Sequence, residues 1–235
     1  GIAIPVALKV LPKIEETSKG RLDVLGGLLL ALVVTGVLFA PSQASQNGWL
    51  SSSAIGGVVV AVVSLSLLVL QQRRSDSPFI PVLLRRNPQY VALVVSSFLV
   101  MSSMVGLLVG LPILLTVFNG ASVLAIGVVM LPSAILSAIS GVDAGKLLGR
   151  ITASRLMVAG GTVMLAGVLG LSSGTGGSEL WMSVYAGLLG LGFGLVNTPL
   201  ATMVTRVVPS GLLSTALGVN SMAFFVGGSV GAAVL

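Results

Sequence analysis

The feature that most constrains this chain is a series of long apolar stretches that are almost free of charge. About 20 apolar residues suffice to cross the hydrocarbon core of a bilayer as a helix. On that basis we expect membrane helices at 24–42, 51–71, 90–117, 123–147, 156–173, 180–204 and 212–235. Only 8% of the 235 residues are charged, against about a quarter in a soluble domain. The sequence therefore predicts an all-α, polytopic membrane protein.

The cations fall only in alternate connections between these stretches. All twelve lysines and arginines lie at 9–21, 73–86, 146–155 and 206, and the connections at 41–49, 118–122 and 172–179 contain none. Cytoplasmic loops of membrane proteins carry the excess of positive charge. We therefore expect the basic connections on the cytoplasmic side and the interfacial Trp49 and Trp181 on the outer side.

Several function classes are excluded by residues that the sequence lacks. It has no cysteine and no histidine, which removes disulfides, zinc-type metal sites and catalytic triads that need an imidazole base. It contains no G-x-x-x-x-G-K-[ST] phosphate loop. We expect no enzyme activity and no cofactor, with energy drawn from an ion gradient or a partner chain. The cations are not interleaved with aromatic residues, so we expect no nucleic-acid partner.

The stretch "SPFIPVLLRRNPQY" (77–90) is apolar at its start and doubly basic near its end. We interpret it as an elbow along the cytoplasmic interface that leads into the third span. A regulatory or partner-docking surface is the alternative.

Small residues recur at every fourth position in four of the predicted spans. This spacing places them on one helix face, where backbones can approach closely. Tight packing of the bundle is the first interpretation, and a smooth seam along which helices move during alternating access is the second. The residues concerned are Ser133, Ser137, Gly141, Gly145 and Gly149, then Ser102, Gly106 and Gly110, then Gly190 and Gly194, and finally Gly227 and Gly231.

Polar groups inside the predicted spans are few. Asn197 and Asn220 are candidates for a translocation path, and so sparse a lining favours a hydrophobic solute over a sugar. Asp143 is the only carboxylate that we expect inside a span, near the cytoplasmic end of its helix. Lys146 lies one turn further on the same face, and Arg150 follows one turn later. We interpret Asp143 as a structural or gating partner of one of these cations, with a proton-carrier role as the alternative.

Five segments in order carry a family resemblance: "GIAIPVALKVLP", "GRLDVLGGLLLAL", "SPFIPVLLRRNPQY", "GVVMLPSAILSAISGVDAGKLLGRITASRLMVAGG" and "GLGFGLVNTPLATMVTRVVPSGLLSTALGVNSMAFFVGGSVGAAVL". Together they resemble the middle and C-terminal part of a fourteen-helix drug/proton antiporter of the major facilitator superfamily. The resemblance implies a partial superfamily helix bundle. Its expected parts are the end of a preceding helix with a cytoplasmic linker (1–23), an inserted two-helix hairpin (24–71), a basic elbow (72–89) and an incomplete C-terminal transporter half (90–235).

The same resemblance implies a function and a location. We expect proton-coupled efflux of hydrophobic or amphipathic drugs across a bacterial cytoplasmic membrane. The partners would be the lipid bilayer, protons, a hydrophobic small molecule and the N-terminal helices of the same protein. Export of an endogenous lipid, peptide or metabolite by the same fold, or a non-transporting membrane fragment, are the alternatives.

The superfamily's short cytoplasmic loop motif is matched only in part. Gly145, Arg150 and Arg155 agree with it, and with Asp143 and Lys146 they form the expected gating set. Three further positions depart from the family pattern. Gly149 stands where the motif has an aspartate that helps to latch one conformation, and Thr152 stands where it has a second glycine. Gly227 stands where tetracycline-type members carry a glutamate.

Overall fold

The computed structural model describes residues 24–74, 81–173 and 178–233, and these residues form helices joined by short turns. The long helices are α2 (Val24–Asn47), α3 (Ser52–Arg74), α5 (Pro88–Asn119), α6 (Val123–Leu147), α7 (Ala153–Ser173), α8 (Glu179–Val207) and α9 (Leu213–Ala233). A short helix α4 (Val82–Arg86) precedes α5, and a 3-10 turn (Ser210–Leu212) precedes α9. Within these described residues, seven helices are long and apolar enough to cross a membrane, which confirms the seven predicted spans. The predicted linker 1–23, residues 75–80 of the predicted elbow and residues 234–235 of the last predicted span lie outside the described residues.

Several helix ends differ from the prediction. Helix α2 continues past Pro41 to Asn47, and α5 begins at Pro88 because the Asn87 side chain accepts hydrogen bonds from the Gln89 and Tyr90 amides. Proline at the first helical position fits this start, since its missing N–H would have no partner there.

The start of α8 adds a second carboxylate to those that lie inside the membrane helices. This helix begins at Glu179, which places a carboxylate in its first turn, where the helix dipole favours negative charge. The expectation that Asp143 is the only carboxylate within a span is therefore wrong.

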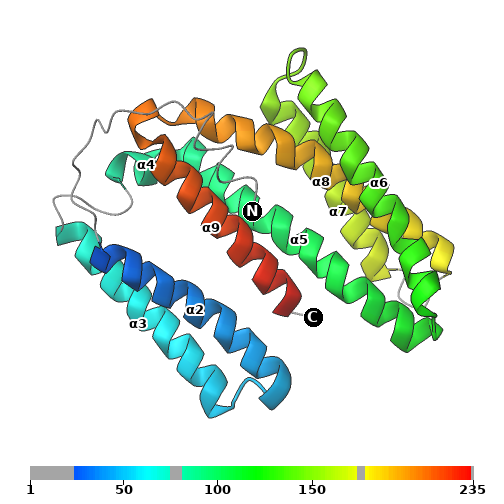
Figure 1. The fold of residues 1–235 in the computed structure, drawn as a ribbon, viewed down its shortest axis with the longest axis horizontal. Helices are drawn as coiled ribbons and strands as arrows, with labels where there is room; N and C mark the ends of the chain where they lie inside the picture. The colour runs from blue at the N-terminus through cyan, green and yellow to red at the C-terminus, as the bar shows by residue number, and fades with distance from the viewer. Residues whose placement is uncertain (1–23, 75–80, 174–177, 234–235) are drawn as a thin grey trace, which may run out of the picture.

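The helices pack as two tight groups and a hairpin (Figure 1). Helices α6 and α7 both lie against α8, while α9 lies against α5. Contacts between α5 and α8 join these two groups, and the α2–α3 hairpin touches the rest mainly through α2 on α9. This arrangement leaves α3 with α2 as its main neighbour within the described chain. Many of its large side chains, Val62 among them, are exposed, while Leu68 is buried.

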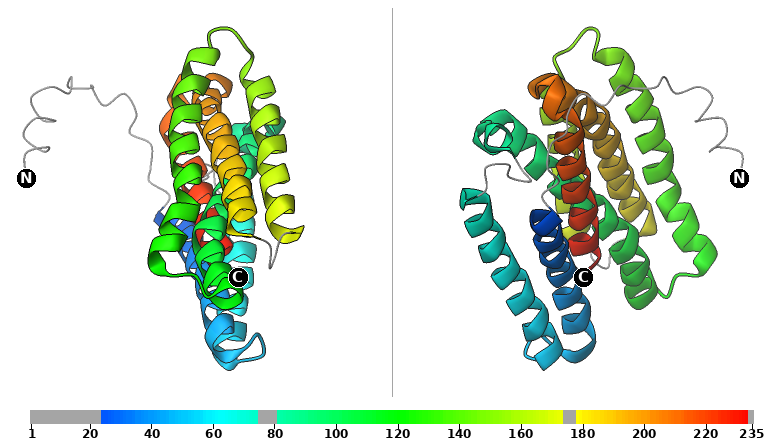
Figure 2. Two further views of the ribbon diagram at one scale, coloured as in Figure 1. Left: turned by 90° about the vertical axis from the view of Figure 1, so that its right-hand side faces the viewer. Right: turned by 60° about the vertical axis from the view of Figure 1, so that its left-hand side comes forward.

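The connections alternate between the two ends of the bundle. The α2–α3 and α5–α6 turns lie at one end, and the α6–α7 and α8–α9 turns lie at the other (Figures 1 and 2). The cations whose side chains are described all fall at or near the second end: Arg85, Arg86, Lys146, Arg150, Arg155 and Arg206. The fold thus places the charge on one side, as the sequence pattern predicts.

Glycines mark the places where helix backbones meet. A Cβ built on Gly194 would lie 2.7 Å from the Gly141 amide nitrogen, and one built on Gly192 would lie 2.5 Å from the Gly160 carbonyl oxygen. The same glycine-bearing helix α8 therefore packs its backbone on α6 with one face and on α7 with another. These contacts agree with the packing interpretation of the small residues.

The fourth-position stripe on α6 does not extend as far as predicted. Gly149 falls beyond the end of α6 at Leu147, and a Cβ on Gly145 would meet only Thr198 at 4.0 Å. The close contact with α8 ends near Gly141, and the remainder of the stripe lies in more open surroundings.

Candidate functional site

The predicted gating residues gather at the basic end of α6. Lys146 Nζ lies 3.2 Å from Asp143 Oδ1, an ion pair across one helical turn. The two side chains are 73% and 51% exposed, respectively, so water screens most of their attraction and the pair contributes about 0.2–0.5 kcal/mol. The intervening Ala144 is fully buried. Burial of Ala144, rather than this pair, therefore holds the end of α6 in place.

A tight turn connects α6 to α7 and exposes the loop arginines. The Ile151 amide donates to the Leu147 carbonyl at 2.7 Å, and the Leu156 amide donates to the Thr152 carbonyl at 3.2 Å. Arg150 is exposed in this turn, and Arg155 is exposed in the first turn of α7. The sequence allowed either Lys146 or Arg150 as the partner of Asp143. Within the described residues Asp143 forms its ion pair with Lys146 and not with Arg150.

Gly149 occupies an open position in this turn. A Cβ built there would approach only the Lys146 carbonyl oxygen, at an ordinary 3.7 Å. An aspartate would therefore fit without displacing the backbone. The absence of the family's loop carboxylate is a property of the sequence and not of the space available.

Thr198 holds the end of α6 against α8, a role that the sequence did not suggest. Its hydroxyl donates to the Gly141 carbonyl at 3.1 Å, and the close approach of the two helices at Gly194 brings it there. No local signal marks this bond, because 57 residues separate the two partners. The bond positions the turn of α6 that carries Asp143.

The two predicted path residues lie on different helices and in different surroundings. On α9, Asn220 accepts a 2.7 Å hydrogen bond from Ser97 of α5, whose side chain is fully buried. Asn197 is half-buried on α8 and forms no hydrogen bond to another side chain among the described residues. The Asn220 carboxamide oxygen is thus used in a hydrogen bond between α5 and α9. A translocation role for either asparagine stays a prediction.

A second hydrogen bond joins α5 to α9 nearer the basic end. The buried Tyr90 hydroxyl donates to the Ala216 carbonyl at 2.9 Å. Further along the pair, a Cβ on Gly227 would lie 2.8 Å from the carbonyl carbon of Phe98. The position at which the family resemblance implies a glutamate in tetracycline-type members is therefore closed by the backbone of α5.

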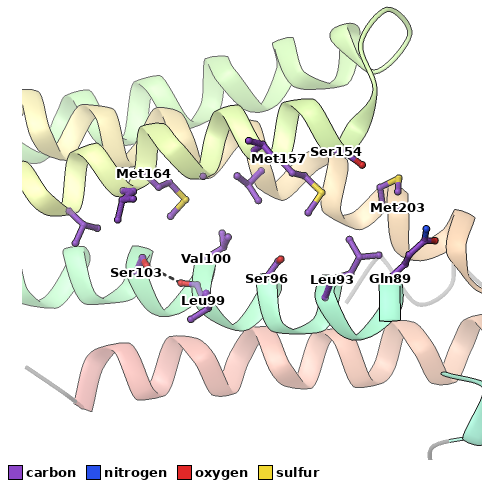
Figure 3. A pocket seen from close by; sticks show the side chains of 16 residues that line it. Gln89, Leu93, Ser96, Leu99, Val100, Ser103, Ser154, Met157, Met164 and Met203 are labelled. Carbon is purple, nitrogen blue, oxygen red and sulfur yellow. Dashed lines mark hydrogen bonds between the residues drawn. The ribbon is translucent and has the colours of Figure 1, made fainter. Parts of the chain in front are cut away.

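An apolar groove of about 730 Å³ lies between α5, α7 and α8 (Figure 3). Met157 and Met164 face α5 across it, with Gln89 and Ser154 near one end. A second cavity of about 350 Å³ continues it as far as Leu114. From Gln89 to Leu114 a helix rises about 37 Å, so the groove is as long as a membrane span. Such a shape suits a helix or acyl chains better than a compact solute, and neither Asn197 nor Asn220 lines it.

The helices, their alternating connections and their apolar outer faces define a multi-pass membrane protein built as a helix bundle. Comparison with known families adds the particular class. Residues 18–232 match the family described as the Major Facilitator Superfamily, and the chain belongs to that family. It is a partial superfamily helix bundle, as the sequence predicted.

Individual relatives are named for drug resistance. The chain is 30% identical to the multidrug resistance protein Stp of Mycobacterium tuberculosis over 215 residues, which cover 92% of this chain and 40% of Stp. It is 28% identical to a tetracycline resistance determinant of Streptomyces rimosus, covering 91% of this chain and 62% of that protein. It is 24% identical to the lincomycin resistance protein LmrB of Listeria innocua, covering 99% of this chain and 50% of LmrB. The chain thus spans about half the length of these relatives.

Proposed function

We propose that this chain forms the C-terminal bundle of an exporter of hydrophobic or amphipathic drugs. The supporting observation is the polarity of the helices. Among the described residues, the carboxylates are Asp143 and Glu179, each near a helix end, and Asn220 is bonded to Ser97. A cavity formed on this bundle would recognise its substrate mainly by apolar contact. Two proteins to which the chain is similar are named for multidrug resistance and for tetracycline resistance.

The driving force in this proposal is the proton gradient, with the coupling carboxylate outside this bundle. Asp143 is exposed and paired with Lys146, and Gly227 leaves no room for a glutamate against Phe98. Acidic residues inside a membrane are costly and are functional candidates by default. We therefore place the proton carrier in the N-terminal helices that would complete the transporter.

The orientation follows from the charge. With the α6–α7 and α8–α9 turns in the cytoplasm, all described cations lie on the side that the positive-inside rule requires. The membrane would then be the bacterial cytoplasmic membrane, and Trp49 and Trp181, both exposed, would lie at its outer interface.

The test is dye efflux from bacteria that lack their own pumps and express the full-length transporter. Cells loaded with ethidium or a tetraphenylphosphonium dye should lose it faster than control cells, and an uncoupler should abolish the difference. A Gly227→Leu variant, in which α9 cannot seat on α5, provides the matched inactive control. Efflux that persists after uncoupling would contradict proton coupling. Failure to export any cationic dye by a protein that is present and folded would contradict drug export and favour an endogenous substrate.

A further inference from the structure

The elbow before α5 is fixed to the bundle by one buried residue and one side-chain amide. Leu84 of α4 is 1% exposed and belongs to the same core as Val204 and Ala216. Asn87 caps α5 and also donates from Nδ2 to the Val207 carbonyl at 3.3 Å. The backbone of Asn87 is extended, so the chain turns there. The elbow therefore has a definite orientation on the α8–α9 turn.

The outer side of α4 combines apolar and cationic side chains. Val82 and Leu83 are 41% and 59% exposed, and Arg85 and Arg86 are exposed as well. On a helix with Leu84 facing the protein, Val82 and Arg86 point away from it and Leu83 and Arg85 flank it. Apolar side chains next to arginines at the end of a membrane span are typical of an element that lies in the lipid headgroup region.

The arginines of the elbow have no acidic partner among the described residues. The described acids are Asp143, which pairs with Lys146, and Glu179, which begins α8 at the opposite end of the bundle. Arg206 adds a third exposed cation next to Val207, the residue that Asn87 contacts. Among the described residues, this corner thus presents exposed positive charge with no acidic side chain paired to it.

We propose that the elbow is a binding site for the headgroups of anionic phospholipids. Arg85 and Arg86 contact the lipid phosphate, and Val82 and Leu83 enter the acyl boundary. Because Asn87 joins the elbow both to the first turn of α5 and to the end of α8, a bound lipid stabilises the contact between those two helices. This site goes beyond the proposed transport function and does not depend on it.

The experiment measures lipid binding to the purified full-length transporter by native mass spectrometry. The probes are phosphatidylglycerol and phosphatidylcholine with matched acyl chains. The elbow variant is Arg85→Gln/Arg86→Gln. The control is Arg150→Gln/Arg155→Gln, which removes the same charge from the same side of the bundle. A basic residue at a membrane surface contributes about 1 kcal/mol, or about fivefold in affinity for anionic lipid.

We expect the elbow variant to bind phosphatidylglycerol roughly 25-fold more weakly, with phosphatidylcholine binding unchanged, and the control to stay close to wild type. A separate Leu83→Gln variant should weaken both lipids, because it removes an acyl contact. Equal losses in the elbow and control variants would overturn the proposal in favour of diffuse attraction to the basic face. Equal binding of the two lipids by the wild type would overturn it as well. Displacement of phosphatidylglycerol by glycerol phosphate at equal concentration would show a site for a soluble anion instead.

Discussion

Replacing Gly227 by alanine tests whether backbone contact holds α9 on α5. The new Cβ would lie 2.8 Å from both the carbonyl carbon and the Cα of Phe98, and closer still to the Phe98 carbonyl oxygen. These are backbone atoms, so no rotamer change can relieve the overlap. Helices α5 and α9 would have to separate by about 0.6 Å to bring the two carbon atoms to the 3.4 Å lower limit of ordinary contact, and by more to clear the carbonyl oxygen.

The magnitude follows from the cost of overpacking. Extra methylenes in a well-packed interior cost about 1–3 kcal/mol, and a backbone clash belongs in the upper part of that range. The separation also stretches the 2.7 Å hydrogen bond from Ser97 to Asn220. The higher helix propensity of alanine offsets little of this cost, because a membrane helix stays helical when the bundle comes apart. We expect Gly227→Ala to destabilise the bundle by about 2 kcal/mol.

Two glycines of the same helix provide matched controls. Gly218 has nothing within 4 Å of its built Cβ, so Gly218→Ala should be neutral to within about 0.5 kcal/mol. Gly228 would meet only the Met101 and Val105 side chains at 3.2 Å, and Gly228→Ala should fall between the two. The assay is the midpoint of thermal unfolding of the full-length protein in detergent, followed by intrinsic fluorescence. Equal midpoints for Gly227→Ala and Gly218→Ala would refute the reasoning.

Three further predictions concern the topology, the ion pair and a buried hydroxyl. In an otherwise cysteine-free protein, Gln46→Cys should react with an impermeant maleimide in intact cells, and Ser154→Cys only after permeabilisation; the reverse pattern would invert the orientation. Asp143→Asn should slow efflux modestly and leave it sensitive to uncouplers, and the double variant with Lys146→Gln should be little worse than either single one. Complete loss of proton-driven efflux in Asp143→Asn, with Lys146 dispensable, would make Asp143 the proton carrier. Ser133 is 3% exposed and its hydroxyl has no hydrogen-bond partner among the described residues. Ser133→Ala should therefore increase the free energy of unfolding by about 1 kcal/mol and raise the unfolding midpoint. A lower midpoint would show that the hydroxyl has a partner.

The spans and their alternation could be predicted from the sequence because both depend on local composition. Twenty apolar residues must be helical in lipid, since every backbone polar group needs an internal partner. The helix ends are harder to predict, and the misplaced start of α5 shows why. "NPQY" at 87–90 contains both an N-cap and a proline suited to the first helical position, yet the prediction began the helix at Tyr90. The sequence contains this capping signal, but a prediction based on hydropathy alone does not detect it.

The contacts between helices could not be predicted from single positions. Ser97 and Asn220 are 123 residues apart, and Asn87 and Val207 are 120 apart. Nothing near any of these residues indicates its partner. The family resemblance implies that tetracycline-type members carry a glutamate at the position of Gly227, but only the position of α5 shows that a glutamate would not fit there. At Gly149, by contrast, lack of space does not explain the missing carboxylate, because a side chain would fit there.

The glycine contacts also bear on how the bundle could move. At Gly192 the backbone of α8 lies so close to the backbone of α7 that a methyl group would not fit between them. At Gly194 the same holds for the backbones of α8 and α6. Sliding one such helix past another by a residue would bring a larger side chain into that space, at about the cost of overpacking. Contacts between α5 and α8, by contrast, are made by side chains in the shared core, among them Leu107 and Leu189, and side chains can repack. The geometry therefore favours α6, α7 and α8 moving as one rigid body, with adjustment at the α5–α8 contact rather than along the glycine seams.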